Sequence, residues 1–221
     1  MSKYIIHACP ERLWYVEDYL IPSMKEQGIK DVTVRNDKHR LGCLHHCMQI
    51  FGSMDGDGGA WHMCDDVIIG RNFRELTEPE PDGIVCGFIW ERDPQKKTGM
   101  VDLQDMRWSF PCIYIPNYLA RECADWYFNE AMHATKYATY VSQRKFDDLM
   151  FLEFLKTHYP SMKVYNHEKS FVDHIDWLIG GSIVNQDRVW KIVRAMWFDD
   201  TDLVDELERR LHGNTGTDDR P

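Results

Sequence analysis

The first third of the chain alternates between short apolar runs and longer segments with helical periodicity. Residues 4–8 form an apolar run that ends before Pro10, and residues 13–24 carry apolar side chains at helical spacing. Residues 31–35 then alternate like a strand, and residues 41–52 carry apolar side chains on one helical face. Strands that alternate with helices in this way predict a parallel sheet with helices packed on it.

The rest of the chain continues the alternation. The further elements that we predict are strands at residues 67–70, 83–90 and 110–115, and helices at residues 117–137 (capped by Asn117), 145–158 and 185–197. Together these patterns predict an α/β fold, with a single Rossmann-like domain over residues 1–198. Its central sheet is expected to be mostly parallel and flanked by helices, and residues 199–221 are expected to form an acidic C-terminal helix or tail.

Composition supports one folded domain with an acidic surface. The chain has 221 residues, 43% of them hydrophobic and 13% aromatic, which is enough to bury a sizeable core. The formal net charge is −10, and half of it lies in residues 199–221, which hold eight acids and three arginines. A broad electrostatic surface for nucleic acid or an anionic bilayer is therefore not expected, although a local basic groove is compatible with this composition.

Cysteine usage and the N-terminal sequence bear on the compartment. The seven cysteines form an odd set without regular spacing, which disfavours a disulfide framework and favours a reducing compartment. The N-terminus lacks the apolar stretch and cleavage site of a signal peptide, and no window of 18 apolar residues occurs. We therefore expect a soluble protein of the cytoplasm, and no membrane partner.

Two adjacent acids, Asp65 and Asp66, follow an apolar run and precede another. Burying a charge is costly unless it is paired or holds a metal, and α/β sheets place ligand sites at strand ends. Mg²⁺ or Mn²⁺ binds carboxylate oxygens and bridges them to a diphosphate. The alternative interpretation is a solvated turn with an ordinary helix cap.

A second acidic pair, Asp147 and Asp148, opens the predicted helix at residues 145–158. Acids in a first helical turn are favoured by the helix dipole, which is a sufficient structural reason for them. The functional interpretation is that one of them is the general base that accepts a proton from an acceptor hydroxyl. We assign this role to Asp148, with Asp147 as the alternative.

The segment around His174 is the third candidate. A neutral imidazole can complete a metal shell, so we place His174 with Asp65 and Asp66. The flexible pair Gly181-Ser182 can bring backbone N–H groups to a phosphate. A structural or surface histidine is the alternative for His174.

The run from Cys43 to Cys47 contains two cysteines and two histidines and resembles a metal motif. Its cysteines are four residues apart on a predicted helix, and no second pair follows at zinc-finger spacing. We therefore interpret this run as core packing.

The order of these motifs resembles the small GT-A glycosyltransferases. The resemblance runs over about residues 4 to 190 and is carried by the segments IIHACPER, DVTVRND, HMCDDVII, KFDDLMFLEFL and KSFVDHIDWLIGGS. Asp65 and Asp66 match the last two positions of the acidic metal motif of that family. Cys64 stands where the first acid often is, and Lys169 replaces the proline of the element that ends in His174.

The resemblance implies roles for these residues. It places Pro10, Arg12 and Asp37 against the donor nucleotide and Asp65, Asp66 and His174 at the metal and diphosphate, and it makes Asp148 or Asp147 the base. We add Arg40, Gly181 and Ser182 to the donor-binding residues. The implied ligands are a nucleotide-sugar, with a UDP-sugar favoured, and Mn²⁺ or Mg²⁺.

The implied reaction is transfer of a sugar to a hydroxyl acceptor. A compact chain of this kind is similar to bacteriophage enzymes that glycosylate hydroxymethylated pyrimidines in DNA, so we expect 5-hydroxymethylcytosine as acceptor and the host cytoplasm as compartment. The arginines that could serve a flipped base and its phosphates are Arg40, Arg71, Arg74, Arg107 and Arg121. A saccharide, lipid-linked sugar or protein acceptor is the alternative, as is a non-catalytic nucleotide-binding or scaffold domain.

Overall fold

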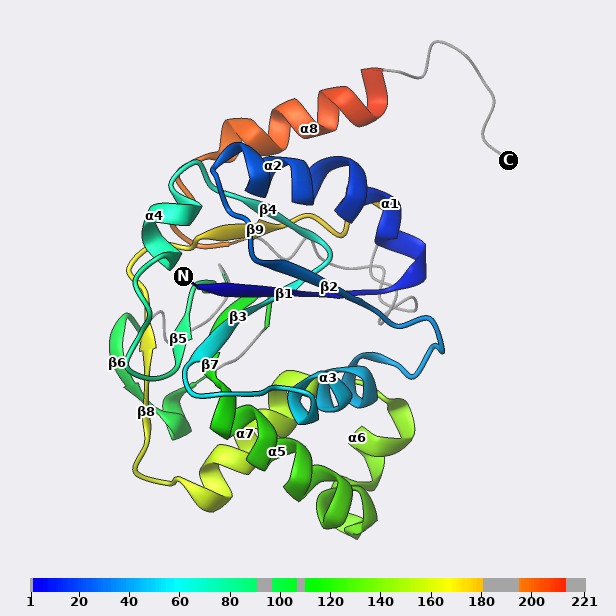
Figure 1. Ribbon diagram of the computed structural model, residues 1–221, viewed down its shortest axis with the longest axis vertical. Helices are drawn as coiled ribbons and strands as arrows, with labels where there is room; N and C mark the ends of the chain where they lie inside the picture. The colour runs from blue at the N-terminus through cyan, green and yellow to red at the C-terminus, as the bar shows by residue number, and fades with distance from the viewer. Residues whose placement is uncertain (1, 91–96, 107–109, 181–194, 214–221) are drawn as a thin grey trace.

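The structure is a computed structural model that describes residues 2–90, 97–106, 110–180 and 195–213. A seven-stranded sheet forms its centre, with the strand order β2-β1-β3-β7-β5-β8-β6 (Figure 1). The strands, in chain order, are β1 (Lys3–Ala8), β2 (Val32–Asn36), β3 (Gly59–Cys64), β5 (Val85–Cys86), β6 (Gly99–Asp102), β7 (Cys112–Pro116) and β8 (Lys163–Asn166). A separate two-stranded sheet consists of β4 (Val67–Ile69) and β9 (Val172–His174).

The three N-terminal strands of the sheet are parallel, as the sequence predicts. β1 lies between β2 and β3, and Ile6 is in register with Val34 on one side and Met63 on the other. The crossover from β1 to β2 is helical from Pro10 to Glu26, and the crossover from β2 to β3 contains α3 (Cys43–Gly52). Because these strands are parallel, their carboxyl ends meet at one edge of the sheet.

The other half of the sheet is mixed. β7 is antiparallel to β3 and to β5, β8 is parallel to β5, and β6 is antiparallel to β8. Five strands therefore run in one direction, while β6 and β7 run in the other. The α/β class with a helix-flanked sheet is confirmed, but the sheet is mixed rather than parallel throughout.

Helices cover both faces of the sheet. On one face lie α3, α5 (Asn117–Asn129), α6 (Ala138–Gln143) and α7 (Asp147–His158) (Figure 1). On the other lie α1 (Leu13–Tyr15), α2 (Ile21–Glu26), the small sheet β4-β9 and α8 (Thr201–Gly213). The remaining helical turns are η1 (Pro10–Arg12), η2 (Val16–Leu20), α4 (Phe73–Thr77), η3 (Leu103–Asp105), η4 (Ala131–His133) and η5 (Thr135–Tyr137).

Several predicted element boundaries are wrong. Of the strand expected at residues 83–90, only Val85 and Cys86 belong to the central sheet, because the chain then leaves it: the carbonyl of Gly87 accepts from Phe171 N–H, just before β9, and Trp90 forms an isolated β-bridge with Ala195. The helix expected to run to residue 137 ends at Asn129. Asn117 does not cap that helix but is its first residue, and its amide donates to the carbonyl of Asp55 at 2.7 Å.

The C-terminal region agrees with the prediction in part. Of the helix expected at residues 185–197, residues 185–194 lie outside the described residues, and Ala195 forms a β-bridge with Trp90. Trp197 has a left-handed φ of 54°, which a helix does not contain. The acidic helix α8 is present, and its Val204 and Leu207 are buried in the same apolar cluster as β1 and α2. None of the helices in the described part of the chain has the length and apolar character needed to cross a membrane.

Candidate functional site

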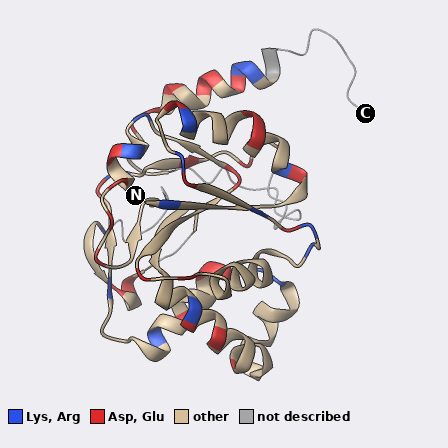
Figure 2. Ribbon diagram, in the orientation of Figure 1, with Lys and Arg blue, Asp and Glu red and all other residues tan. Residues whose placement is uncertain are grey.

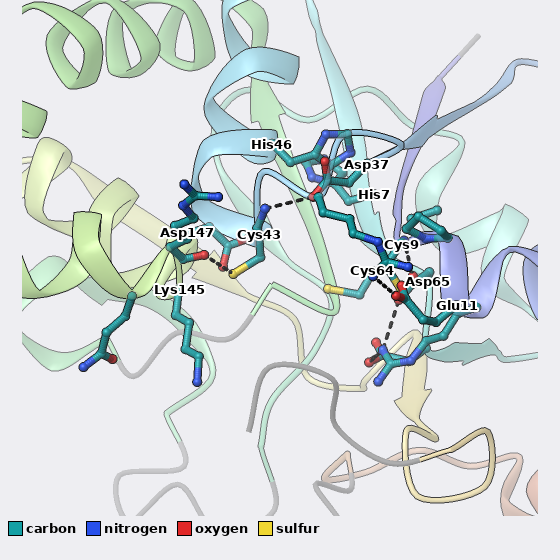
Figure 3. A pocket seen from close by; sticks show the side chains of 18 residues that line it. His7, Cys9, Glu11, Asp37, Cys43, His46, Cys64, Asp65, Lys145 and Asp147 are labelled. Atoms are coloured by element: carbon teal, nitrogen blue, oxygen red, sulfur yellow. Dashed lines mark hydrogen bonds and ion pairs between the residues drawn. The ribbon is translucent and has the colours of Figure 1, made fainter. Parts of the chain in front are cut away.

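A pocket of about 370 Å³ lies at the carboxyl ends of β1, β2 and β3. Figure 3 shows three groups of side chains around it: His7, His46 and Asp37 at one end, Cys9 and Asp65 on one wall, and Cys43, Lys145 and Asp147 on the opposite wall. It is lined by seven of the predicted site residues, namely Pro10, Arg12, Asp37, Arg40, Asp65, Asp66 and Asp147. These residues lie far apart in the sequence. The fold brings them together because β1, β2 and β3 end at the same edge of the sheet.

One wall is an ion-pair cluster around Arg12. The guanidinium of Arg12 is buried, and its Nη1 donates to Asp65 Oδ1 at 3.1 Å and to the carboxylate of Asp66. The backbone N–H of Cys9 donates to Asp65 Oδ2 at 2.7 Å. Asp65 and Asp66 thus lie in the turn between β3 and β4, and the turn from β1 into η1 supplies the groups that neutralise them.

His174 completes this wall from the small sheet. The pairing of β4 with β9 sets His174 beside Asp66, with Nε2 3.3 Å from Asp66 Oδ2 and Nδ1 3.3 Å from Asp176 Oδ1. Burial alone would lower the pKa of His174, but the two carboxylates outweigh it and raise the pKa to about 10. Burial would also raise the pKa of Asp66, yet His174 and Arg12 hold it well below its usual value.

A divalent cation fits this wall only if a bound substrate supplies part of its coordination shell. Three of the four carboxylate oxygens of Asp65 and Asp66 already accept from Arg12, Cys9 or His174, and Asp66 Oδ1 is buried without a hydrogen-bond partner among the described residues. Those residues contain no cluster of three or more His, Cys, Asp or Glu side chains arranged for a metal. Mg²⁺ commonly takes one or two carboxylates plus substrate phosphates, which is the arrangement that Asp65 and Asp66 can serve.

The carboxylate of Asp37 stabilises the loop that begins at this residue. Its Oδ1 accepts from Leu41 N–H at 2.8 Å and its Oδ2 from Gly42 N–H at 2.9 Å. Asp37 itself is held at the end of β1 by a bond from its N–H to the carbonyl of Ala8. The carboxylate predicted to meet the nucleotide therefore fixes the loop that carries Arg40 to the pocket mouth, where Arg40 pairs with Glu11.

The opposite wall carries the second acidic pair at the start of α7. Asp147 lines the pocket beside Cys43, whereas Asp148 lies behind it, with Oδ1 accepting from Leu149 N–H at 2.8 Å. Burial raises the pKa of both carboxyls, and the charge of Asp147 contributes to a pKa of about 7 for Asp148. The structure thus gives Asp147, the second choice from the sequence, the place nearest to a ligand.

Other predicted residues lie elsewhere. Gly181 and Ser182 are outside the described residues, as is Arg107. Arg71 pairs with Asp200 and Asp202 on the far side of the molecule, Arg74 pairs with Glu78, and Arg121 donates to backbone carbonyls. Of the arginines suggested for an acceptor, Arg40 is the one that lines the pocket.

Three residues of the site were not expected from the sequence: His7 and Cys43, which line the pocket, and Asp176, which lies beside His174. His7 lines one end and its Nε2 lies 2.9 Å from Nδ1 of His62; burial lowers the pKa of both, so this pair is neutral at pH 7. The sequence signal for His7 was a histidine at the end of an apolar strand. Cys47 is buried in the core as predicted, but Cys43 lines the pocket. The sequence signal for Asp176 was its position two residues after His174, as the second aspartate of this segment after Asp173.

Comparison with known proteins adds no assignment. The chain matches no protein-family model and no curated protein. The functional argument therefore rests on the geometry of the pocket.

Proposed function

We propose that the protein is a nucleotide-sugar-dependent glycosyltransferase with a GT-A-like fold. The observation that carries the proposal is the placement of acids on opposite walls of one pocket: Asp65 and Asp66 follow a parallel strand, and Asp147, the first residue of α7, faces them. One pair is held by cations, and the other has a carboxyl group that titrates near neutral pH. A pocket of about 370 Å³ is within the range of small-molecule sites.

In this proposal the Arg12 wall holds the donor diphosphate. Pro10 and Arg12 approach the nucleotide from η1, and the loop fixed by Asp37 closes over it. Asp65 and Asp66 would hold Mn²⁺ or Mg²⁺ against the diphosphate, and the metal would stabilise the negative charge of the leaving group. Arg12, which neutralises the two acids in the ligand-free arrangement, would then turn its charge toward the phosphates.

The Asp147 wall takes the acceptor. A carboxylate of the Asp147-Asp148 pair accepts the proton of the acceptor hydroxyl while its oxygen forms a bond to the anomeric carbon. The bond from that carbon to the diphosphate breaks, and the nucleoside diphosphate leaves with the electron pair. The raised pKa of both carboxyls suits this role because a base with a pKa near the working pH is both deprotonated and basic, and Asp147 is the member of the pair that lines the pocket.

Calorimetry with UDP and a turnover assay with a panel of nucleotide-sugars test the donor side. We expect UDP to bind, Mn²⁺ to strengthen its binding, and Asp66→Asn to remove the effect of Mn²⁺. The exposed Asp125 on α5 offers a matched control, Asp125→Asn, that should behave as the wild type. Equal UDP affinity in excess EDTA would contradict the metal assignment, and failure to bind any nucleoside diphosphate would contradict the function.

A nucleotide-binding domain without transferase activity is the second candidate. The neutralisation of Asp65 and Asp66 by Arg12 and His174 favours it, since these acids need no further ligand for stability. UDP binding without release of UDP from any nucleotide-sugar, with or without acceptor, would select this alternative.

A further inference from the structure

Two histidines lie side by side at one end of the pocket, on neighbouring strands of the sheet. His62 of β3 is in register with Ile5 of β1, and His7 follows two residues later on the same face of the sheet. Nε2 of His7 lies 2.9 Å from Nδ1 of His62, which is hydrogen-bond distance. His7 lines the pocket, whereas His62 is buried at 2% exposure and does not line it. A ligand can therefore reach His7, and His62 acts on a ligand only through His7.

Both rings of this pair are neutral at pH 7. Burial lowers the pKa of each ring, and the neighbouring histidines add to this effect at His7. β1 and β3 carry one charged residue between them, Lys3 at the opposite end of β1, as Figure 2 shows. A neutral imidazole has one nitrogen that donates and one that accepts. In the bond between the two rings, one histidine is therefore the donor and the other the acceptor.

The far nitrogen of His62 decides which ring donates. Nε2 of His62 is buried and has no hydrogen-bond partner among the described residues. If His62 accepted at Nδ1, its own N–H would lie on Nε2 as a buried donor without a partner, which is rare in folded proteins. Phe51 packs against His62 with 5.1 Å between the ring centroids, but an N–H contact with an aromatic ring is a weak substitute. By this hydrogen-bond accounting, His62 donates from Nδ1 to His7.

The bond from His62 fixes the tautomer of His7. Since Nε2 of His7 accepts from His62, the single N–H of the neutral His7 ring lies on Nδ1. Nδ1 of His7 bonds to no described residue and is accessible, at the end of the pocket that Figure 3 shows. The buried histidine thus makes the pocket-lining histidine the donor of one uncharged hydrogen bond.

The neighbouring His46 adds an acceptor at the same end. Its ring centroid lies 6.3 Å from that of His7, and its Nε2 lies 2.9 Å from the carbonyl oxygen of Arg35. A carbonyl only accepts, so Nε2 of His46 is the donor, and Nδ1 of the neutral ring is an acceptor. His7 and His46 together offer a donor and an acceptor, and the edge of a nucleobase presents the complementary groups, a carbonyl oxygen beside an N–H.

We infer that His7 donates its Nδ1–H to a carbonyl oxygen of the ligand's nucleobase, and that His62 is the positioning residue that makes His7 a donor. The inference rests on the proposed function for the class of ligand. A phosphate binds best to charged donors, and the buried guanidinium of Arg12 is such a donor. An uncharged N–H suits an uncharged oxygen, so the nucleobase lies at the His7 end and the phosphates lie at the Arg12 wall.

The first test reads the tautomer of His7 from the nitrogen chemical shifts of its ring. In protein with nitrogen-15-labelled histidine at pH 7, Nδ1 of His7 should be protonated and Nε2 unprotonated. The His7→Phe spectrum identifies which resonances belong to His7. In His62→Phe, which keeps a ring but removes the N–H donor, His7 should become a mixture of both tautomers. A wild-type His7 protonated at Nε2, alone or together with Nδ1, would overturn the inference.

The second test is calorimetry with uridine, UDP and inorganic pyrophosphate. His7→Phe should weaken uridine and UDP by the same factor, roughly fivefold to tenfold for one uncharged hydrogen bond, and leave pyrophosphate unchanged. His62→Phe should weaken uridine and UDP by about twofold, because a mixture of tautomers leaves about half of the molecules with a donor at Nδ1. His45→Phe is the matched control, since His45 contacts Tyr127 and does not line the pocket. The thermal midpoint of each variant shows that it is folded.

The inference and the proposed function fail in different ways. A wild type that binds uridine through His7 but transfers no sugar from any nucleotide-sugar contradicts the proposed function and leaves the inference standing. A wild type that transfers a sugar, with full uridine affinity in His7→Phe, leaves the function standing and overturns the inference. Loss of pyrophosphate affinity in His7→Phe, an equal loss of uridine affinity in His45→Phe, or no binding of uridine by the wild type would also overturn it.

Discussion

The two walls of the pocket carry the same dipeptide in different electrostatic surroundings: burial raises the pKa of Asp65, Asp147 and Asp148, and the pKa of Asp66 alone is lowered. Asp65-Asp66 lies between Arg12 and His174, and this environment keeps Asp66 ionised. Asp147-Asp148 lies at a helix start with no cation in an ion pair with it among the described residues, and burial there raises the pKa of both carboxyls. Paired aspartates therefore have no fixed role: Arg12 and His174 together keep Asp66 ionised, whereas burial without a paired cation favours the protonated form of Asp147 and Asp148.

The largest expected effect is a loss of turnover on replacement of Asp147 or Asp148. Replacement of Asp147 or Asp148 by Asn should lower kcat by about 10² to 10⁴, because the acceptor hydroxyl loses its base. Donor binding should be nearly unchanged, since these residues lie on the wall opposite Asp65. Steady-state kinetics and UDP calorimetry measure the two effects. Near-normal kcat in both single variants would place the base elsewhere.

The next largest effect should come from removing the cation of the other wall. Arg12→Met leaves Asp65 and Asp66 buried without their guanidinium, and breaking a buried ion pair in this way costs about 3–5 kcal/mol. Urea unfolding measures the loss. Arg74→Met is the control, because Arg74 pairs with Glu78 at the surface and should contribute about 0–1 kcal/mol. Similar losses in the two variants would show that the Arg12 cluster is not the source of stability.

A pH profile should sharpen the difference between the walls. The neighbouring carboxyls of Asp147 and Asp148 titrate as a pair, and the pKa of Asp148 is raised to about 7, so kcat should fall about tenfold for each pH unit below 7 as the pair takes up a proton. Stability changes in the opposite direction. A carboxyl whose pKa is raised on folding stabilises the protein fully below its unfolded pKa near 4, and this contribution is lost as pH rises through 7.

Asp148→Asn tests the effect of pH on stability. In this variant the stability decrease between pH 4 and 7 should shrink, as measured by chemical denaturation at each pH. A stability curve identical to that of the wild type would mean that Asp148 titrates at an ordinary pKa.

The smallest effect is expected at the pocket mouth. Arg40→Gln removes the exposed ion pair with Glu11 and should change the free energy of unfolding by about 0–1 kcal/mol. Chemical denaturation of Arg40→Gln and of Arg12→Met compares the contributions of an exposed and a buried guanidinium of the same pocket to the free energy of unfolding. A loss at Arg40 as large as that at Arg12 would contradict the role of burial in the comparison.

The sequence was sufficient where local pattern decides the structure. The apolar run before Pro10 and the alternation around Val34 predicted β1 and β2, and parallel pairing then brings Asp37 and Asp65 to one edge. The pairing partner of Asp65 was not predictable, because nothing in the local sequence of η1 says that Arg12 turns inward. The antiparallel position of β7 depends on long-range packing that no local pattern encodes.

At the Asp147 wall, the sequence identified the acidic pair but not which of its two members lines the pocket. Both acids at the start of α7 were found, but the choice between them depends on the rotation of the helix at its first residue. Phe146, directly before α7, has a left-handed φ of 68°, and a left-handed phenylalanine has no signature in a single sequence. The structure therefore turns Asp147 to the pocket where the sequence favoured Asp148.

The close approach of Gly42 to Arg144, where a Cβ at position 42 would lie 2.7 Å from Cβ of Arg144, has a consequence for binding equilibria. In the proposed function it joins the loop at residues 37–42, beside the nucleotide, to the loop at residues 143–146, beside the acceptor, so the substrate that binds first is expected to restrict the motion of both loops. The second substrate then binds loops that have already lost their conformational entropy, which favours its binding. Linkage makes this effect reciprocal: UDP should tighten binding of the acceptor by the same factor by which the acceptor tightens binding of UDP. Gly42 is thus expected to make the two binding events cooperative, and a side chain at this position should make them independent.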